Sequence, residues 1–241
     1  MCLCPVTVVH TMHEGGPVLG VTSLGEEIYL LRRKGGRDPV EVYDVISYCR
    51  QRYLTVPNAN VFIDMTSCEH LSCLYISDAG ASCIHRLDLQ GNAQQWRVNE
   101  MPCTGLSVNV HHNLIVTCEI VGKIKEFNPH GELVRVIILP SDVINPYHAI
   151  QLTSGQFIVC HGKGNDPMHR VCKISSDGRQ IVQSHGGQRG SDTGQYHWPI
   201  HLAVDDNEFV FVVSLFNRRV TLLSPTLEYI RQAVSPYHLI S

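Results

Sequence analysis

The segment HWPIHLAVDDNEFVFVVSLFNRRVTLLSP, residues 197–225, decides how this chain is expected to fold. Two short apolar strands are separated by an acidic turn, and a third strand begins after FNRRV. A single hairpin of this kind would fit many mixed folds. If the same pattern recurs along the whole chain, it indicates a repeat protein instead.

The apolar run FVFVVS, which begins at residue 209, has counterparts along the chain. EIYLLR begins at 27, CLYISD at 73, NLIVTC at 113 and QFIVCH at 156, so successive starts differ by 46, 40, 43 and 53 residues. Apolar residues alternate or run in short groups bounded by Gly, Asn, Asp and Pro, which is typical of strands. A period in the forties built from strands predicts the blades of a β-propeller.

Each run is flanked by similar partners. A first strand such as IHLAVD (200–205) precedes it, and a third strand such as RRVTLLS (218–224) follows it. A polar turn such as NPHGE then leads to a fourth strand, and its Gly and Asn-Pro supply the backbone angles of a tight hairpin. The pattern therefore predicts five full four-stranded blades, at about 17–57, 58–100, 102–140, 145–186 and 197–235.

The sequences of three of these units resemble a known repeat family. PIHLAVDDNEFVFVVSLFNRRVTLLSP is similar to the NHL repeat, and LYISDAGASCIHRLDLQGN (74–92) and KIKEFNPHGELVRVI (123–137) resemble parts of it. The chain departs from the family pattern at Ser214, where Asp is usual, and in the longer loop RRKGGRDP. The resemblance implies a six-bladed propeller that binds protein or RNA, often at the end of a ligase-type protein.

The two ends of the chain have strand character as well. CPVTVVHTM (4–12) resembles a fourth strand, and SPYHLIS (235–241) resembles a first strand. We therefore expect one all-β domain over 1–241: a six-bladed propeller whose last blade is incomplete, with only strands 4–12 and 236–241. Because an open ring leaves exposed sheet edges, we expect the chain to be a piece of a longer protein.

The amino-acid composition narrows the range of possible functions. A net charge of −3 indicates no general affinity for nucleic acid or anionic membranes, and no apolar run approaches the ~20 residues that cross a bilayer. The N-terminus lacks the features of a signal peptide, and the ten cysteines contain no C-x-x-C pair. We expect reduced, mostly buried cysteines in a cytoplasmic protein with no cofactor.

Three histidines recur at the start of predicted innermost strands: His148, His201 and His238. Imidazoles that converge on a channel suit zinc, and the pattern resembles one family of peptide-amidating lyases. A metal-dependent lyase is therefore one alternative, and a polar channel without metal is the interpretation we prefer. Because no G-x-S-x-G, H-E-x-x-H or P-loop motif is present, we predict a protein that is not an enzyme.

The loops assigned to one face, here called the upper face, combine basic and aromatic residues. The opposite, lower face carries mostly acidic turns. We predict a protein partner for the upper face, as in the substrate-recognition end of a ubiquitin-ligase-like protein, with RNA as the alternative. The predicted partner-binding residues are Arg32, Arg33, Lys34, Arg37, Tyr147, His148, Trp198, His201, Phe216, Arg218, Tyr237 and His238.

Overall fold

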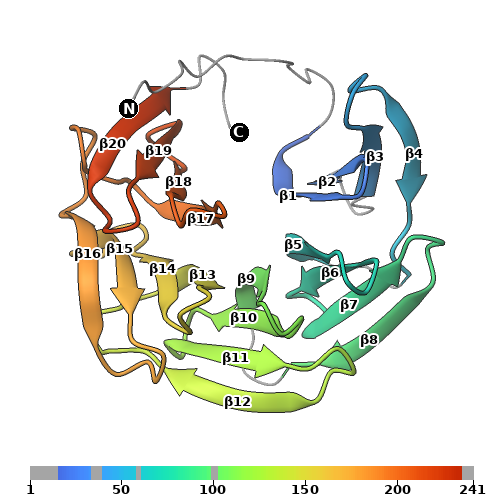
Figure 1. Ribbon diagram of the computed structural model, residues 1–241, viewed down its shortest axis with the longest axis horizontal. Helices are drawn as coiled ribbons and strands as arrows, with labels where there is room; N and C mark the ends of the chain where they lie inside the picture. Colours follow the sequence, from blue (N-terminus) through green and yellow to red (C-terminus); the bar gives the residue numbers. More distant parts are fainter. Residues whose placement is uncertain (1–15, 34–39, 58–60, 99–102, 235–241) are drawn as a thin grey trace.

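The computed structural model describes residues 16–33, 40–57, 61–98 and 103–234. All twenty elements in these ranges are strands, and they form five antiparallel sheets of four strands each. Figure 1 shows the sheets as blades arranged around a central opening. Within each blade the strands follow one another from the centre outward, so β1, β5, β9, β13 and β17 are innermost.

The strands are numbered in chain order, four to a blade. Blade 1 contains β1 (Val18–Leu24), β2 (Glu27–Arg32), β3 (Val40–Asp44) and β4 (Arg50–Leu54). Blade 2 contains β5 (Phe62–Cys68), β6 (Cys73–Asp78), β7 (Cys83–Asp88) and β8 (Ala93–Arg97). Blade 3 contains β9 (Cys103–Val108), β10 (Leu114–Cys118), β11 (Lys123–Phe127) and β12 (Leu133–Ile138). Blade 4 contains β13 (Pro146–Gln151), β14 (Phe157–His161), β15 (His169–Ile174) and β16 (Ile181–Gly187). Blade 5 contains β17 (Pro199–Val204), β18 (Val210–Ser214), β19 (Arg219–Leu223) and β20 (Tyr229–Val234).

The all-β propeller of four-stranded blades is confirmed, but the expected six-bladed type is wrong. The propeller has five four-stranded blades, and each takes its four strands from one continuous segment. The error came from assigning strands at both ends of the chain to a shared closing blade. Residues 4–12 and 236–241, on which that assignment depended, lie outside the described residues.

The core consists of four apolar clusters, one at each interface between consecutive blades. Tyr29 and Leu74 belong to the cluster between blades 1 and 2, and Tyr75 and Leu114 to the next. The remaining two clusters fill the interfaces of blades 3 with 4 and 4 with 5. Burying these apolar sheet faces against each other is what stabilises the stack of blades.

The inner strands approach one another closely, and glycine permits this at one critical point. A Cβ atom on Gly105 in β9 would lie 2.5 Å from the carbonyl oxygen of Tyr147 and 2.7 Å from the Cα of His148 in β13. Such contacts are far inside van der Waals distance, so only glycine fits here. This close packing brings side chains from several blades into the channel.

Blades 5 and 1 stand farther apart than the other neighbouring blades (Figure 1). Val21 on β1 is 62% exposed and Phe211 on β18 is 37% exposed, although both are apolar. Among the described residues, the ring is therefore open between its first and last blades. No helix in the described part of the chain is long and apolar enough to cross a membrane.

Candidate functional site

A cavity of about 740 Å³ occupies the centre of the ring and extends toward the open side. Its wall contains residues from all five innermost strands and, on the open side, Phe211 and Val213 of β18. The wall is mostly apolar, with a small polar group at one point. A cavity of this size with few convergent polar side chains is typical of a ligand-binding site.

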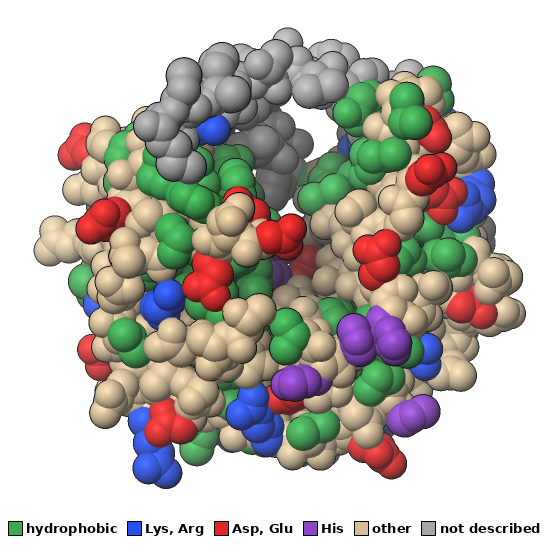
Figure 2. Space-filling model, in the orientation of Figure 1, with side chains coloured by type: hydrophobic (Ala, Val, Ile, Leu, Met, Phe, Trp, Pro, Cys, Tyr) green, Lys and Arg blue, Asp and Glu red, His purple; other side chains and the backbone are tan. Residues whose placement is uncertain are grey.

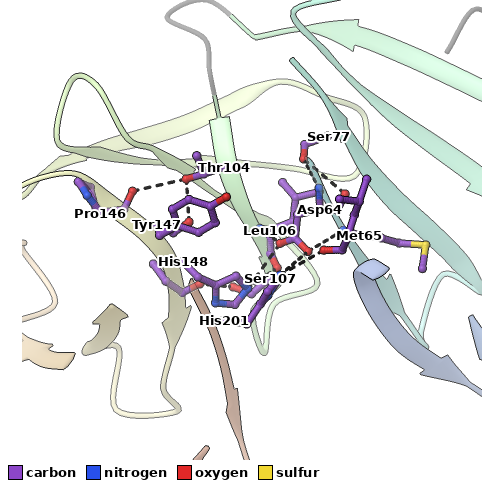
Figure 3. Close-up of polar contacts among 12 residues, drawn as sticks. Asp64, Met65, Ser77, Thr104, Leu106, Ser107, Pro146, Tyr147, His148 and His201 are labelled. Carbon is purple, nitrogen blue, oxygen red and sulfur yellow. Dashed lines mark hydrogen bonds and ion pairs between the residues drawn. The ribbon is translucent and has the colours of Figure 1, made fainter. Parts of the chain in front are cut away.

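The polar group of the cavity consists of Asp64, His148 and His201, which come from β5, β13 and β17 (Figure 3). The Nε2 atom of His148 lies 3.7 Å from Asp64 Oδ2, and the Nε2 atom of His201 lies 3.7 Å from Asp64 Oδ1. The two imidazole centroids are 5.3 Å apart. The structure therefore brings together two of the three predicted channel histidines, and it adds a carboxylate. We call these three residues the channel cluster.

Asp64 is fixed in position by the backbone. Its Oδ1 accepts a hydrogen bond from the Met65 N–H (2.8 Å), and its Oδ2 accepts one from the Leu106 N–H (2.8 Å). The second bond joins β5 to β9, because Asp64 and Leu106 belong to neighbouring blades. Burial raises the pKa of Asp64 to about 6, although the charge of His201 and these N–H donors act in the opposite direction.

His148 is buried and neutral at pH 7. Burial lowers its pKa to about 3, with the charge of His201 acting in the same direction. Its approach to Asp64 is therefore not an ion pair. Nε2 of the neutral ring lies 3.0 Å from the carbonyl oxygen of Leu106 and donates to it, and the buried Nδ1 has no hydrogen-bond partner among the described residues.

The upper face carries a second candidate site, formed by Tyr147, His197, Trp198 and Phe216, which we call the aromatic patch. The ring centroids of Tyr147 and Trp198 are 6.3 Å apart, and those of Trp198 and Phe216 are 5.5 Å apart. His197 lies 4.7 Å from Phe216. Three of the predicted partner-binding residues thus form one surface at the junction of blades 4 and 5.

The backbone of this patch is strained at Trp198, which has φ = 64°. A bulky side chain rarely adopts this left-handed conformation, which costs of order 1–3 kcal/mol. The Trp198 N–H donates to Nδ1 of the buried His169 (2.9 Å), and its carbonyl accepts from the Leu215 N–H (2.9 Å). Neighbouring groups therefore hold the backbone of Trp198 in place, while Phe216 remains 55% exposed.

Several basic side chains of the upper face are bonded within the protein. Arg32 is buried and donates to Glu41 Oε2 (2.7 Å), and Lys163 forms an ion pair with Glu119. Arg189 donates to the carbonyl oxygen of Gly164 and to Asn165 Oδ1, both at 3.1 Å. Arg33 and Arg218 are exposed. Lys34, Arg37, Tyr237 and His238 lie outside the described residues.

The lower face is acidic. The turns that follow the innermost strands β1 and β17 carry exposed Glu26, Asp205 and Asp206. Figure 2 shows acidic side chains around the central opening on the face that it presents. Negative charge at the mouth of a channel attracts cations toward its interior.

Two residues of these sites, Asp64 and His197, were not predicted from the sequence. Asp64 interrupts the apolar strand VFIDM, and a carboxylate at such a position signals a buried hydrogen-bonded group. A second buried cluster was also missed: Asp78, Cys83 and His85, with His85 Nε2 3.3 Å from Asp78 Oδ2 and 3.4 Å from Cys83 Sγ. Asp78 Oδ1 also accepts from the N–H groups of Val61 and Ala81, so this carboxylate fixes local loops.

No protein-family model matches this chain, and no curated protein matches it significantly. Solved structures with the same fold are found. A virginiamycin B lyase from Staphylococcus aureus is 14% identical with a TM-score of 0.63, and the alignment covers 92% of this chain and 71% of that one. The nidogen/laminin complex contains a chain that is 9% identical with a TM-score of 0.70, and the alignment covers 90% of this chain and 80% of that one. A functionally unknown protein from Desulfotomaculum acetoxidans is 12% identical with a TM-score of 0.66, and the alignment covers 99% of this chain and 78% of that one. These similarities show a β-propeller fold. The proteins that share it include a lyase and a member of a protein complex.

Proposed function

We propose that this chain is a non-enzymatic recognition module that binds a protein partner through the aromatic patch on its upper face. The observation that carries the proposal is the grouping of Tyr147, Trp198 and Phe216 at one blade junction. Aromatic residues are enriched in the energetically dominant centres of protein interfaces. Trp198, whose backbone is held by two hydrogen bonds, lies beside an exposed Phe216 and so supplies such a centre on a preorganised backbone.

An RNA ligand is the alternative. It is less well supported because phosphate binding needs free basic side chains, and Arg32, Lys163 and Arg189 already have partners within the protein. Arg33 and Arg218 are exposed, but they lack the surrounding positive field that an RNA surface requires. A protein partner accommodates this mixed surface better.

The cysteines support a reducing compartment. Seven of the eight cysteines in the described part of the chain are buried, and Cys49 is exposed. Buried cysteines pack as small apolar residues, as is common in proteins of reducing compartments. We therefore place the module in the cytoplasm, where it would act as the substrate-recognition end of a ubiquitin-ligase-like protein.

The proposal is tested by affinity capture with two variants of the patch. Phe216→Ser removes an exposed ring, and Trp198→Gly removes the indole at a position where glycine adopts φ = 64° without strain. Ile46→Ser is the matched control, because Ile46 is 80% exposed in the β3–β4 turn on the opposite face. We expect both patch variants to lose the same bound proteins and the control to retain them, also after nuclease treatment. Equal capture by all three variants would contradict the proposal.

A further inference from the structure

The channel cluster connects three separate blades of an open ring. Asp64 belongs to blade 2, His148 to blade 4 and His201 to blade 5. We propose that the cluster binds a divalent first-row transition-metal ion such as Zn²⁺, and that this ion clamps the three blades together across the channel. Such a clamp would hold blade 2 to blades 4 and 5 across the channel, and it would take the place of the contact between His201 and the Leu19 carbonyl of blade 1.

The distances fit a single ion. Atoms bound to one ion at about 2.1 Å lie at most about 4.2 Å from each other. The two separations between Asp64 and the histidine Nε2 atoms are both 3.7 Å, so they already meet this limit (Figure 3). All three donor atoms lie within 4.8 Å of one another, so the histidine pair needs to close by less than about 1 Å.

The donor set selects the class of metal. Two imidazoles and one carboxylate suit Zn²⁺, Co²⁺ and Ni²⁺, whereas Mg²⁺ and Ca²⁺ prefer oxygen donors only. Three protein ligands leave at least one coordination position for water. The side chain of His201 is 28% exposed and lines the central cavity, so an ion can enter from the cavity and keep a water ligand there.

The surroundings already hold the ligands in place. The N–H groups of Met65 and Leu106 orient the carboxylate of Asp64, as outer hydrogen bonds do in metal sites. For each ring, metal binding replaces the contact of Nε2 with a carbonyl, and the proton moves to Nδ1. His148 Nδ1 has no hydrogen-bond partner among the described residues, so no other bond has to break.

The charge of the channel favours a cation. Asp64 is the one carboxylate of the cluster, and it is buried beside the two imidazoles. The acidic turns with Glu26, Asp205 and Asp206 lie at the ends of β1 and β17 and add negative potential at the mouth.

The experiment measures thermal unfolding of the whole chain in EDTA and in excess Zn²⁺, Co²⁺ or Mg²⁺, together with metal stoichiometry by atomic emission. An ion that binds only the folded state raises Tm by about 5–10 °C at about a hundred times Kd. We expect this shift with Zn²⁺ and Co²⁺ but not with Mg²⁺, at one ion per chain. The shift should disappear in His201→Gln and in Asp64→Asn.

Two control variants remove the competing sites. Cys83→Ser changes the buried cluster of Asp78, Cys83 and His85. His70→Ser removes an exposed histidine that stacks on His112 at 4.0 Å. Both controls should keep the full shift, and bound Co²⁺ should show no thiolate charge-transfer band. No shift in the wild type, a shift that survives in His201→Gln, or a shift lost in either control would overturn the proposal.

Discussion

The Nε2 atom of His201 lies 3.3 Å from the carbonyl oxygen of Leu19, 182 residues earlier in the chain. This contact joins β17 of the last blade to β1 of the first, where the blades otherwise stand apart (Figure 1). At the other junctions, large apolar clusters hold consecutive blades together. At this junction, among the described residues, the side chain of His201 reaches from one blade to the other.

Replacing His201 by Ala should therefore loosen blade 1. The loss of one hydrogen bond is expected to reduce the free energy of unfolding by about 1 kcal/mol, and to speed amide hydrogen exchange in β1 more than in β9. Urea unfolding and hydrogen-exchange mass spectrometry check this. His130→Ala, an exposed position in blade 3, should change stability by no more than about 0.5 kcal/mol. If His201→Ala increased the amide exchange rate equally in all innermost strands, this link between blades 5 and 1 would be refuted.

The channel cluster also predicts a pH dependence. The pKa of Asp64 is raised to about 6 by burial, so between about pH 4 and pH 6 the folded chain holds a proton that the unfolded chain has lost. This contribution makes stability fall as pH rises, by up to about 1.4 kcal/mol per pH unit. The pKa of His148, lowered to about 3 by burial, contributes the opposite slope, because the unfolded chain binds the proton.

Asp64→Asn removes the first contribution and keeps the second. Its stability, measured by urea unfolding in EDTA, should rise more steeply from pH 4 to pH 6 than that of the wild type. Parallel curves for the two proteins would show that Asp64 is not protonated in this range.

Arg32 and Arg33 are neighbours with opposite environments. Arg32 is 4% exposed and its partner Glu41 is 1% exposed, whereas Arg33 lies on the surface. Removing one member of a buried pair leaves an uncompensated charge, so Arg32→Ala should lower the free energy of unfolding by about 3–5 kcal/mol. Arg33→Ala should stay within about 0.5 kcal/mol. Chemical denaturation of both variants decides this, and similar stabilities would contradict the buried pairing.

The close approach of β9 and β13 makes Gly105 irreplaceable. In Gly105→Ala, the added methyl would meet the backbone of Tyr147 and His148, and backbone cannot move aside as a flexible side chain does. We expect a loss of more than about 2 kcal/mol, as for other overpacked core sites. Gly187→Ala is the matched control, since no atom lies within 4 Å of its added Cβ. A thermal scan in which the two alanine variants melt together would argue against this packing.

The repeat in the sequence was sufficient to predict four-stranded propeller blades, because period-two patterning and turn residues are local properties. The number of blades is not a local property of the sequence. It depended on how the two ends of the chain were assigned, and that assignment gave six instead of five.

The candidate sites, like the number of blades, could be predicted only as far as local patterns in the sequence reach. His148 and His201 were found because they occupy equivalent positions in two repeats, and the aromatic residues because their loops share a face. Asp64 occupies the position of β5 that is equivalent to His148 in β13 and His201 in β17, directly after the bulge of the innermost strand. It was missed because its side chain differs from theirs, whereas the histidines recur. The burial of Arg32 depends on Glu41 in the adjacent strand, a pairing that loop composition does not reveal.

Site-specific photocrosslinking tests the proposed recognition surface most directly. A photoreactive amino acid in place of Phe216 should form crosslinks to a protein partner, and the same residue in place of Ile46, on the opposite face, should form none. Mass spectrometry and nuclease digestion identify the adducts. Protein adducts confined to position 216 are the predicted result. RNA adducts at 216, or partner crosslinks only at position 46, would contradict the account.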